Sequence, residues 1–312
     1  MTHGQFIIKQ ELRIRQVHIK MNIAVLSDIH SNYVALQTCI EYAINDGINT
    51  YIFLGDYVGD LAYPQKVMDI LYELNEKYRC FFVKGNKEDY WINYEMNREQ
   101  GWKEYDSTTG VLYDTYHNLK RRDLQFFKSL SHREELNFEG LLPITICHGS
   151  PEKVSEKLLP DNEKSLLLIE KDSNTVILCG HTHLQGMIEH KGKMALNPGS
   201  VGVSLHSNGS AQFMILRGMP DRWDYEFISL KYDVEKVIAD LYSSGLSEKA
   251  PYWCSVSEHL LRTGEISHGA VLAMAMTLCK RKFGECNWPN VPEECWRQAV
   301  KEMYRTEGNI HL

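Results

Sequence analysis

The sequence predicts a mixed α/β fold that carries a helical cap insertion and ends in a helical appendage. Three observations support this prediction. Short apolar runs alternate with helix-like stretches early in the chain, an aromatic-rich helical stretch interrupts them at 86–132, and short strand-like segments separated by turn residues fill 187–230. The chain has 312 residues, of which 43% are hydrophobic, so we expect one large domain with a sizeable core plus an appendage.

The early part of the chain has the pattern of a β-α-β-α-β series. Residues 21–27 (MNIAVLS) form a short apolar run that predicts a buried strand, and 33–45 spaces its apolar residues as one helix face. A second strand is expected at 50–55 (TYIFLG), a helix that opens on a proline at 64–78, and a third strand at 79–84 (RCFFVK). This alternation predicts parallel strand pairing.

Strand signals return after the insertion, at 143–148 (PITICH) and 175–180 (TVILCG). The segments within 187–230 are separated by Gly, Asn and Pro, which predicts an antiparallel meander. Beyond it the pattern is helical, and includes helices at about 265–282 and 292–304.

These patterns divide the chain into three regions. Residues 1–20 are basic and lack a cleavage-site pattern, so we expect a dispensable leader and take Met21 as a candidate natural start. Residues 21–245 make up the main domain, which contains the helical insertion. Residues 246–312 form a C-terminal helical extension.

The composition argues against several classes of protein. A formal net charge of −7 and a pI near 6.0 do not fit a surface that holds nucleic acid. No apolar run approaches the roughly 18 residues of a membrane span and no secretory signal is present, so we expect a cytoplasmic protein whose eight cysteines form no disulfide framework. The late cysteines contain no CxxC pair and do not define a zinc site. They are Cys254, Cys279, Cys286 and Cys295.

Side chains of the metal-binding type recur at one kind of place, the end of a predicted strand. Taken singly, an Asp, Asn or His there is most often a turn residue or a hydrogen-bonded loop residue. However, the carboxyl ends of strands line the ligand-binding crevice of an open α/β sheet, so five successive strand ends would deliver these groups to one pocket. In chain order the groups are Asp28, His30, Asp56, Asn86, His148, His181 and His183.

This mixture of side chains indicates the kind of metal. Imidazole, carboxylate and amide oxygen ligands suit Mn²⁺, Fe, Zn²⁺, Co²⁺ or Ni²⁺ rather than Ca²⁺. Two acids and up to four histidines are too many for one ion. The sequence therefore predicts two divalent transition-metal ions, with Mn²⁺ favoured.

The motifs DIH, GDYVGD, GN, CHG and GHTH, in this order, resemble those of the calcineurin-like metallophosphoesterases over residues 21–245. The nearest likeness is to the compact bacterial and archaeal phosphodiesterase-type branch, whose first motif commonly reads DIHSN and whose last is followed by a segment like the NPGSVG at 197–202. The resemblance implies a four-layer α-β-β-α sandwich with mixed sheets. It also implies a phosphoric ester hydrolase.

The resemblance further implies how the side chains divide between the metals. One metal would be held by Asp28, His30 and His183, the other by Asn86, His148 and His181, with Asp56 bridging the two. Asp56, Asn86 and His148 would also count as catalytic. A hydroxide shared by two metals about 3.5 to 4 Å apart would attack a small phosphoester in line. Phosphodiesters and nucleotide polyphosphates are favoured over phosphoproteins.

The stretch GNKED departs from the family pattern, because it places Lys87 where many members have a histidine that protonates the leaving oxygen. Lysine is a poor acid at pH 7, since its pKa lies about three units higher. Lys87 is instead a candidate for binding phosphate, with pairing to Glu88 or Asp89 and plain solvation as alternatives. His117 is a second candidate substrate contact. The aromatic residues of the insertion are expected in the core, with a base-stacking lid as the alternative.

Two rival functions are considered. A metallophosphoesterase-fold scaffold, catalytically weak or inactive, would recruit a partner through the C-terminal helices, but it would be expected to lack metal ligands, and none is missing here. A nuclease would favour a basic surface. The expected partner is therefore a small phosphoester rather than a membrane or a nucleic acid, and no motif specifies an oligomeric state.

Overall fold

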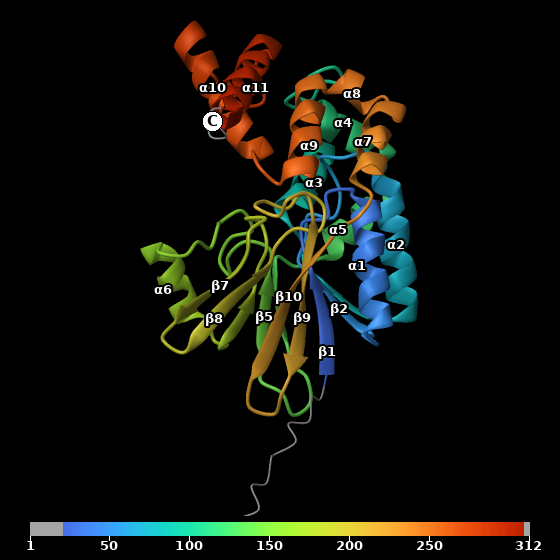
Figure 1. The fold of residues 1–312 in the computed structure, drawn as a ribbon, viewed down its shortest axis with the longest axis vertical. Coiled ribbons are helices and arrows are strands. Elements are labelled where there is room, and N and C mark those ends of the chain that lie inside the picture. Colours follow the sequence, from blue (N-terminus) through green and yellow to red (C-terminus); the bar gives the residue numbers. More distant parts are fainter. Residues whose placement is uncertain (1–20, 309–312) are drawn as a thin grey trace, which may run out of the picture.

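The computed structural model describes residues 21–308, so the leader expected at 1–20 lies outside the described residues. Two five-stranded sheets pack face to face, and helices flank both of them (Figure 1). The chain therefore has the four-layer α-β-β-α architecture, with C-terminal helices stacked beyond one end of the sandwich. No helix within the described part of the chain is both long and apolar enough to span a membrane.

Both sheets are mixed. The first has the order β10-β9-β1-β2-β3, in which β1, β2 and β3 run parallel and β9 is antiparallel to both of its neighbours. The second has the order β4-β5-β6-β8-β7, with β5, β6 and β8 parallel and an antiparallel strand at each edge. The strands are β1 Met21–Leu26, β2 Thr50–Phe53, β3 Arg79–Phe82, β4 Arg133–Leu136, β5 Ile144–Cys147, β6 Val176–Leu178, β7 Gln185–His190, β8 Lys193–Pro198, β9 Ala211–Gly218 and β10 Trp223–Leu230.

Helices α1, α2 and α5 cover the outer face of the first sheet, and α6 covers the outer face of the second (Figure 1). The insertion supplies α3, α4 and α5. The helices are α1 Tyr33–Asn45, α2 Pro64–Lys77, α3 Asn86–Met96, α4 Gly110–Asn118, α5 Arg121–Ser129, α6 Glu163–Lys171, α7 Val234–Ser243, α8 Leu246–Lys249, α9 Pro251–Thr263, α10 His268–Phe283 and α11 Glu293–Gly308.

Strand β1 shows why the predicted strands have continuous apolar runs. Ile23 and Val25 point into the space between the sheets, whereas Ala24 and Leu26 join the cluster beneath the helices. Successive residues of a strand face opposite sides, and both sides of β1 are covered. The buried positions 23–26 are therefore all apolar, whereas Asn22 lies at the partly exposed start of the strand.

One expectation about strands is wrong, and one strand was not predicted. The segments within 187–230 do not form one meander, because β7 and β8 make a hairpin in the second sheet while β9 and β10 make one in the first. Turn residues mark each hairpin but not the sheet that it joins. Strand β4 was not expected because its sequence, REEL, is short and charged, as suits an exposed edge strand.

The C-terminal helices share a core with the loops at the end of the sandwich. One buried cluster contains Leu61, Ala62 and Val203 from those loops together with Trp253 of α9 and Trp296 of α11. The helices expected at about 265–282 and 292–304 correspond to α10 and α11, and α8 and α9 precede them. Burial of shared apolar surface therefore fixes this region over the strand ends.

Candidate metal centre

The structure brings the seven side chains predicted as metal ligands together at one end of the sandwich. Each lies just beyond the carboxyl end of a strand, in the segment that follows the strand. Asp28 and His30 follow β1, Asp56 follows β2, Asn86 opens α3 after β3, His148 follows β5, and His181 and His183 follow β6.

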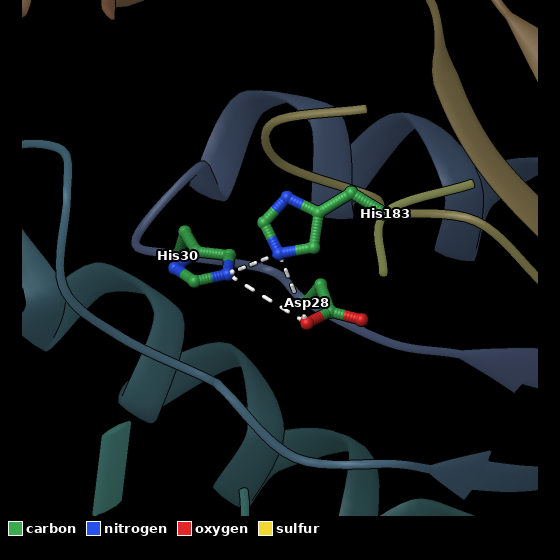
Figure 2. Close-up of side chains that lie close together, drawn as sticks. All are labelled: Asp28, His30 and His183. Carbon is green, nitrogen blue, oxygen red and sulfur yellow. Dashed lines mark hydrogen bonds and ion pairs between the residues drawn. The ribbon is translucent and has the colours of Figure 1, made fainter. Parts of the chain in front are cut away.

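The first group consists of Asp28, His30 and His183 (Figure 2). Asp28 Oδ1 lies 3.2 Å from His183 Nε2 and 3.7 Å from His30 Nε2. The two ring nitrogens lie 3.2 Å from each other. Figure 2 shows both rings and the carboxylate turned toward one small volume.

The second group consists of Asp56, His148 and His181, whose ligand atoms all lie within 4.8 Å of one another. Asn86 Oδ1 joins it, at 3.1 Å from His148 Nε2. Asp56 Oδ2 lies 3.5 Å from His148 Nε2 and 3.8 Å from His30 Nε2. Asp56 therefore stands between the two groups.

Each of the four histidines turns one ring nitrogen inward and holds the other on an oxygen of the protein. Metal-binding histidines characteristically use the outer nitrogen in this way, since it orients the ring and leaves the inner lone pair free for a cation. The outer contacts are His30 Nδ1 to Asp60 Oδ2 at 2.9 Å, His148 Nδ1 to the Leu54 carbonyl at 2.8 Å, His181 Nε2 to the Ser155 carbonyl at 3.0 Å and His183 Nδ1 to the Val203 carbonyl at 3.1 Å.

The inward-facing atoms fit divalent cations. Asp28 Oδ1 is buried and accepts no hydrogen bond, and Asn86 Oδ1 faces the inner nitrogen of His148. Buried acceptors are costly unless a donor or a cation satisfies them. The mixed nitrogen and oxygen donors are those preferred by first-row divalent metals. The residues present therefore suit two such ions.

The charged groups of the site shift one another's pKa values. Burial lowers the pKa of His30 and His148, but nearby carboxylates outweigh it, mainly Asp60 for His30 and Asp56 for His148, so these values rise to about 10 and about 9. Burial raises the pKa of Asp28, yet the charges of neighbouring histidines hold it well below its usual range. A cation at the inner nitrogens of His30 and His148 competes with the proton that the nearby carboxylates stabilise there.

The backbone of these loops is strained. Five of the seven residues, all but Asn86 and His148, have φ between 49° and 66°, which is uncommon outside glycine and clusters at functional sites. Two glycines allow the close approach of the loops. A Cβ on Gly85 would lie 2.2 Å from Asp56 Oδ1, and one on Gly180 would lie 2.7 Å from Asp28 Oδ2.

Lys87 is neither solvated nor paired with its sequence neighbours. Its Nζ donates to Asp60 Oδ1 at 2.6 Å, and the other oxygen of Asp60 lies 2.9 Å from His30 Nδ1. Glu88 instead accepts hydrogen bonds from backbone N–H groups, and Asp89 pairs with other side chains. The charge of Lys87 is therefore largely balanced by Asp60.

A cavity of about 250 Å³ opens over the metal-facing side chains. Its opposite wall comes from α3, α4, α9, α10 and the segment between α10 and α11. Lys87 and Lys157 are its two lysines, and among the described residues Lys157 has no acidic partner. The C-terminal helices thus form a roof over the site.

Sequence reasoning missed several residues of this cavity. Asp60 stands inside the motif GDYVGD, so the motif itself could have indicated it. Lys157, Trp253, His268 and Trp288 also line the cavity, but they lie in segments without a motif. Only packing of the chain onto itself places them there.

His117 lies on an exposed part of α4, and its Nδ1 is 2.8 Å from the Tyr113 carbonyl. It does not line the cavity, so its position gives no support to the expected substrate contact. Among the insertion's aromatic residues, Trp91 and Tyr94 are buried in the core, as expected. Tyr90 instead lines the cavity.

The fold and the candidate metal centre together are those of the metal-dependent phosphoesterases. Residues 21–217 match the family model of the calcineurin-like phosphoesterase superfamily domain, and the chain belongs to this family of phosphoric ester hydrolases. An uncharacterised protein of Methanocaldococcus jannaschii is 28% identical over 256 residues, which cover 75% of this chain and 96% of the relative.

Two solved structures share the fold. A metallophosphoesterase from Sphaerobacter thermophilus aligns with a TM-score of 0.60 and 22% identity, covering 78% of this chain and 99% of its own. A hypothetical protein from Pyrococcus horikoshii aligns with a TM-score of 0.64 and 18% identity, covering 79% of this chain and 100% of its own.

Proposed function

We propose that the chain is a dinuclear metal-dependent phosphohydrolase that cleaves a small phosphoester, with phosphodiesters and nucleotide polyphosphates as favoured substrates. The observation that carries the proposal is the convergence of inward-facing nitrogen and oxygen donors in two adjoining groups. A cavity of about 250 Å³ favours a small ester over a phosphoprotein. Membership of the phosphoesterase family supports the reaction class.

The side chains would divide between two cations, of which Mn²⁺ is the favoured species. Asp28, His30 and His183 would hold one cation, Asn86, His148 and His181 the other, and Asp56 would contact both. When bound, two such cations would supply Lewis acidity and make hydroxide available near neutral pH for in-line attack on phosphorus. The fixed outer contacts of the histidines keep the rings oriented for this task.

Two lysines of the cavity have different roles in this proposal. Lys157 presents an unbalanced positive charge, which suits the phosphoryl oxygens of the substrate. Lys87 holds its ammonium group on Asp60, so it is a poor proton donor to the leaving oxygen. Hydrolysis should therefore be faster when the leaving group is stable as an anion.

The test is a substrate screen with chelated protein and with protein reconstituted with Mn²⁺ or another transition metal. The panel contains matched aryl and alkyl esters of mono-, di- and polyphosphates. We expect hydrolysis only with metal, and faster release of aryl than of alkyl groups. Undiminished hydrolysis by metal-free protein would contradict the mechanism, and metal binding without hydrolysis of any ester would favour the scaffold alternative.

A further inference from the structure

The cavity over the metal-facing groups has two unlike sides. One side carries the metal-facing histidines, the acids and Asn86, and the other, which also includes Thr108 and His268, contains most of the aromatic and apolar side chains. The apolar side is formed by Tyr90, Leu112, Trp253, Leu260, Leu272 and Trp288. A phosphoester held by its phosphoryl group on the first side would direct its organic group toward the second.

Two aromatic residues of the apolar side are accessible. Tyr90 of α3 is 38% exposed and Trp288, between α10 and α11, is 45% exposed. Their ring centroids lie 6.2 Å apart and their planes differ by 31°. Trp253, in contrast, is 9% exposed and stacks on His268, so little of its ring is accessible to a ligand.

Tyr90 and Trp288 differ from other exposed aromatic side chains because they line the cavity. Tyr42, Tyr105, Tyr242 and Phe283 are also exposed, but none of them lines the cavity. Trp288 also lies outside the segment 21–217 that matches the family model. The pair therefore combines Tyr90 of the insertion with Trp288 of the C-terminal region, and both line the cavity beside the metal-facing groups.

We infer that Tyr90 and Trp288 form a stacking subsite for a planar aromatic group of the substrate, such as a purine base. The inference rests on the proposed function for the place of the phosphoryl group. Planar groups stack on aromatic side chains through their π faces, whereas a saturated ring of similar size lacks such a face. The subsite thus selects phosphoesters with a nucleobase or aryl group.

The test measures equilibrium binding, by calorimetry, to the full chain loaded with Mn²⁺. The ligands are phosphonates, whose P–C bond the hydrolase cannot cleave, so binding is independent of turnover. The first pair is the methylene phosphonate analogues of AMP and of ribose 5-phosphate, which carry adenine and a hydroxyl group, respectively, at C1 of the ribose. The second pair is phenylphosphonate and cyclohexylphosphonate, which tests a simple aryl group.

We expect the AMP analogue to bind about tenfold more tightly than the ribose analogue, within the range that base stacking contributes. Trp288→Ala and Trp288→Leu should both bring this ratio close to one, because the leucine keeps apolar bulk but has no planar face. Phe283→Ala, which removes an exposed aromatic ring outside the cavity, should leave the ratio unchanged.

A wild-type ratio near one in both ligand pairs would overturn the subsite, as would a ratio that survives in both Trp288 variants. A preference in the phenyl pair alone would keep the subsite and assign it to simple aryl esters. Hydrolysis of phosphoesters without a base or aryl preference would reject the subsite and retain the proposed function. Tighter binding of the AMP analogue without hydrolysis of any phosphoester would retain the subsite and reject the hydrolase.

Discussion

Lys87 brings a positive charge into the wall of the cavity, and Asp60 holds it there. The side chains of Lys87 and Asp60 are 12% and 5% exposed, and Asp60 also contacts His30. A buried ion pair does not by itself add much stability, but removal of one partner leaves the other charge buried without compensation. Breaking the pair should therefore cost more stability than the intact pair contributes.

We expect Lys87→Met to lower the free energy of unfolding by about 3 kcal/mol. The double variant Lys87→Met with Asp60→Asn should lose less than the sum of the two single variants, because neither charge is then left alone. Urea denaturation of the four proteins measures this coupling. Lys77→Met, which breaks an exposed pair with Glu73, is the control and should cost less than about 1 kcal/mol. Additive losses would contradict the pairing.

Asp56 lies within 4 Å of histidines from both metal-facing groups. We predict that Asp56→Asn lowers kcat at least about 100-fold and reduces the metal bound per chain, since one negative charge between two cations is lost. Steady-state kinetics and metal analysis measure the two effects. Asp46→Asn, at the exposed end of α1, should change neither. Turnover close to wild type in Asp56→Asn would exclude a role for Asp56 between two metals.

The raised pKa values of His30 and His148 have consequences for pH dependence. The unfolded chain loses its imidazole protons near pH 6.5, whereas the folded metal-free chain keeps them until about pH 10 and about pH 9. The contribution of these two groups to stability is thus complete below pH 6.5 and is lost as pH rises through the folded pKa values.

We therefore expect the Tm of the chelated protein to fall between pH 7 and pH 9, and the gain in Tm on adding Mn²⁺ to grow over the same interval. Metal binding should also release protons, which calorimetry in buffers of different ionisation enthalpy detects. A gain in Tm that is independent of pH would contradict competition between proton and metal.

At the scale of elements, the first turn of α3 holds the loop that carries Asp56. Glu88 is fully buried, and its carboxylate accepts hydrogen bonds from the backbone N–H groups of Asp56, Tyr57 and Gly85 at 2.9 Å each. A short helix thus ties the ends of β2 and β3 together.

We predict that Glu88→Gln lowers the free energy of unfolding by about 3 kcal/mol, because its amide group cannot accept from every N–H that the carboxylate serves. The affinity for metal should fall about 10- to 100-fold, since the loop of Asp56 loses its support. Glu95→Gln, on the same helix in an exposed pair with Lys128, is the matched control. Equal effects of the two substitutions would show that Glu88 does not position the loop.

At the scale of the whole molecule, the C-terminal helices and the end of the sandwich that carries the metal-facing groups share one core. Trp296 of α11 is fully buried, and its Nε1 donates to Thr108 Oγ1 at 2.9 Å. Glu293 of the same helix accepts from Ser107 Oγ at 2.8 Å. Helix α11 is therefore bound to the segment before α4, nearly two hundred residues earlier in the chain.

We expect Trp296→Ala to lower the free energy of unfolding by about 3 to 5 kcal/mol, the usual cost of truncating a buried aromatic side chain. Far-UV circular dichroism and tryptophan fluorescence should report a single coincident transition, because the helices and the sandwich share apolar contacts. Phe283→Ala, at an exposed site on α10, should have little effect. Two separated transitions in wild type would show that the C-terminal region unfolds independently.

The order of polar motifs after apolar runs was sufficient to predict the family, the sheet class and the convergence of the seven side chains. This works because a strand end is a local feature, and the parallel strands of each sheet place their carboxyl ends along one edge. Face-to-face packing of the two sheets then brings the ends of β1, β2 and β3 beside those of β5 and β6. Asp28, Asp56 and His148 could be located in this way before any contact was known. The oxygens that orient the histidine rings could not, since the Leu54 carbonyl beside His148 and the Val203 carbonyl beside His183 have no side-chain signal.

Local sequence thus determined which apolar segments become strands and which polar groups follow them, because hydrophobic periodicity and turn chemistry act over a few residues. The charged edge strand β4 was the exception. Only the tertiary structure decided that β7 and β8 join one sheet while β9 and β10 join the other, that Asp60 is the partner of Lys87, and that Trp288 lies at the lip of the cavity. These outcomes depend on burial and charge compensation between residues distant in the chain, and no local pattern encodes such a contact.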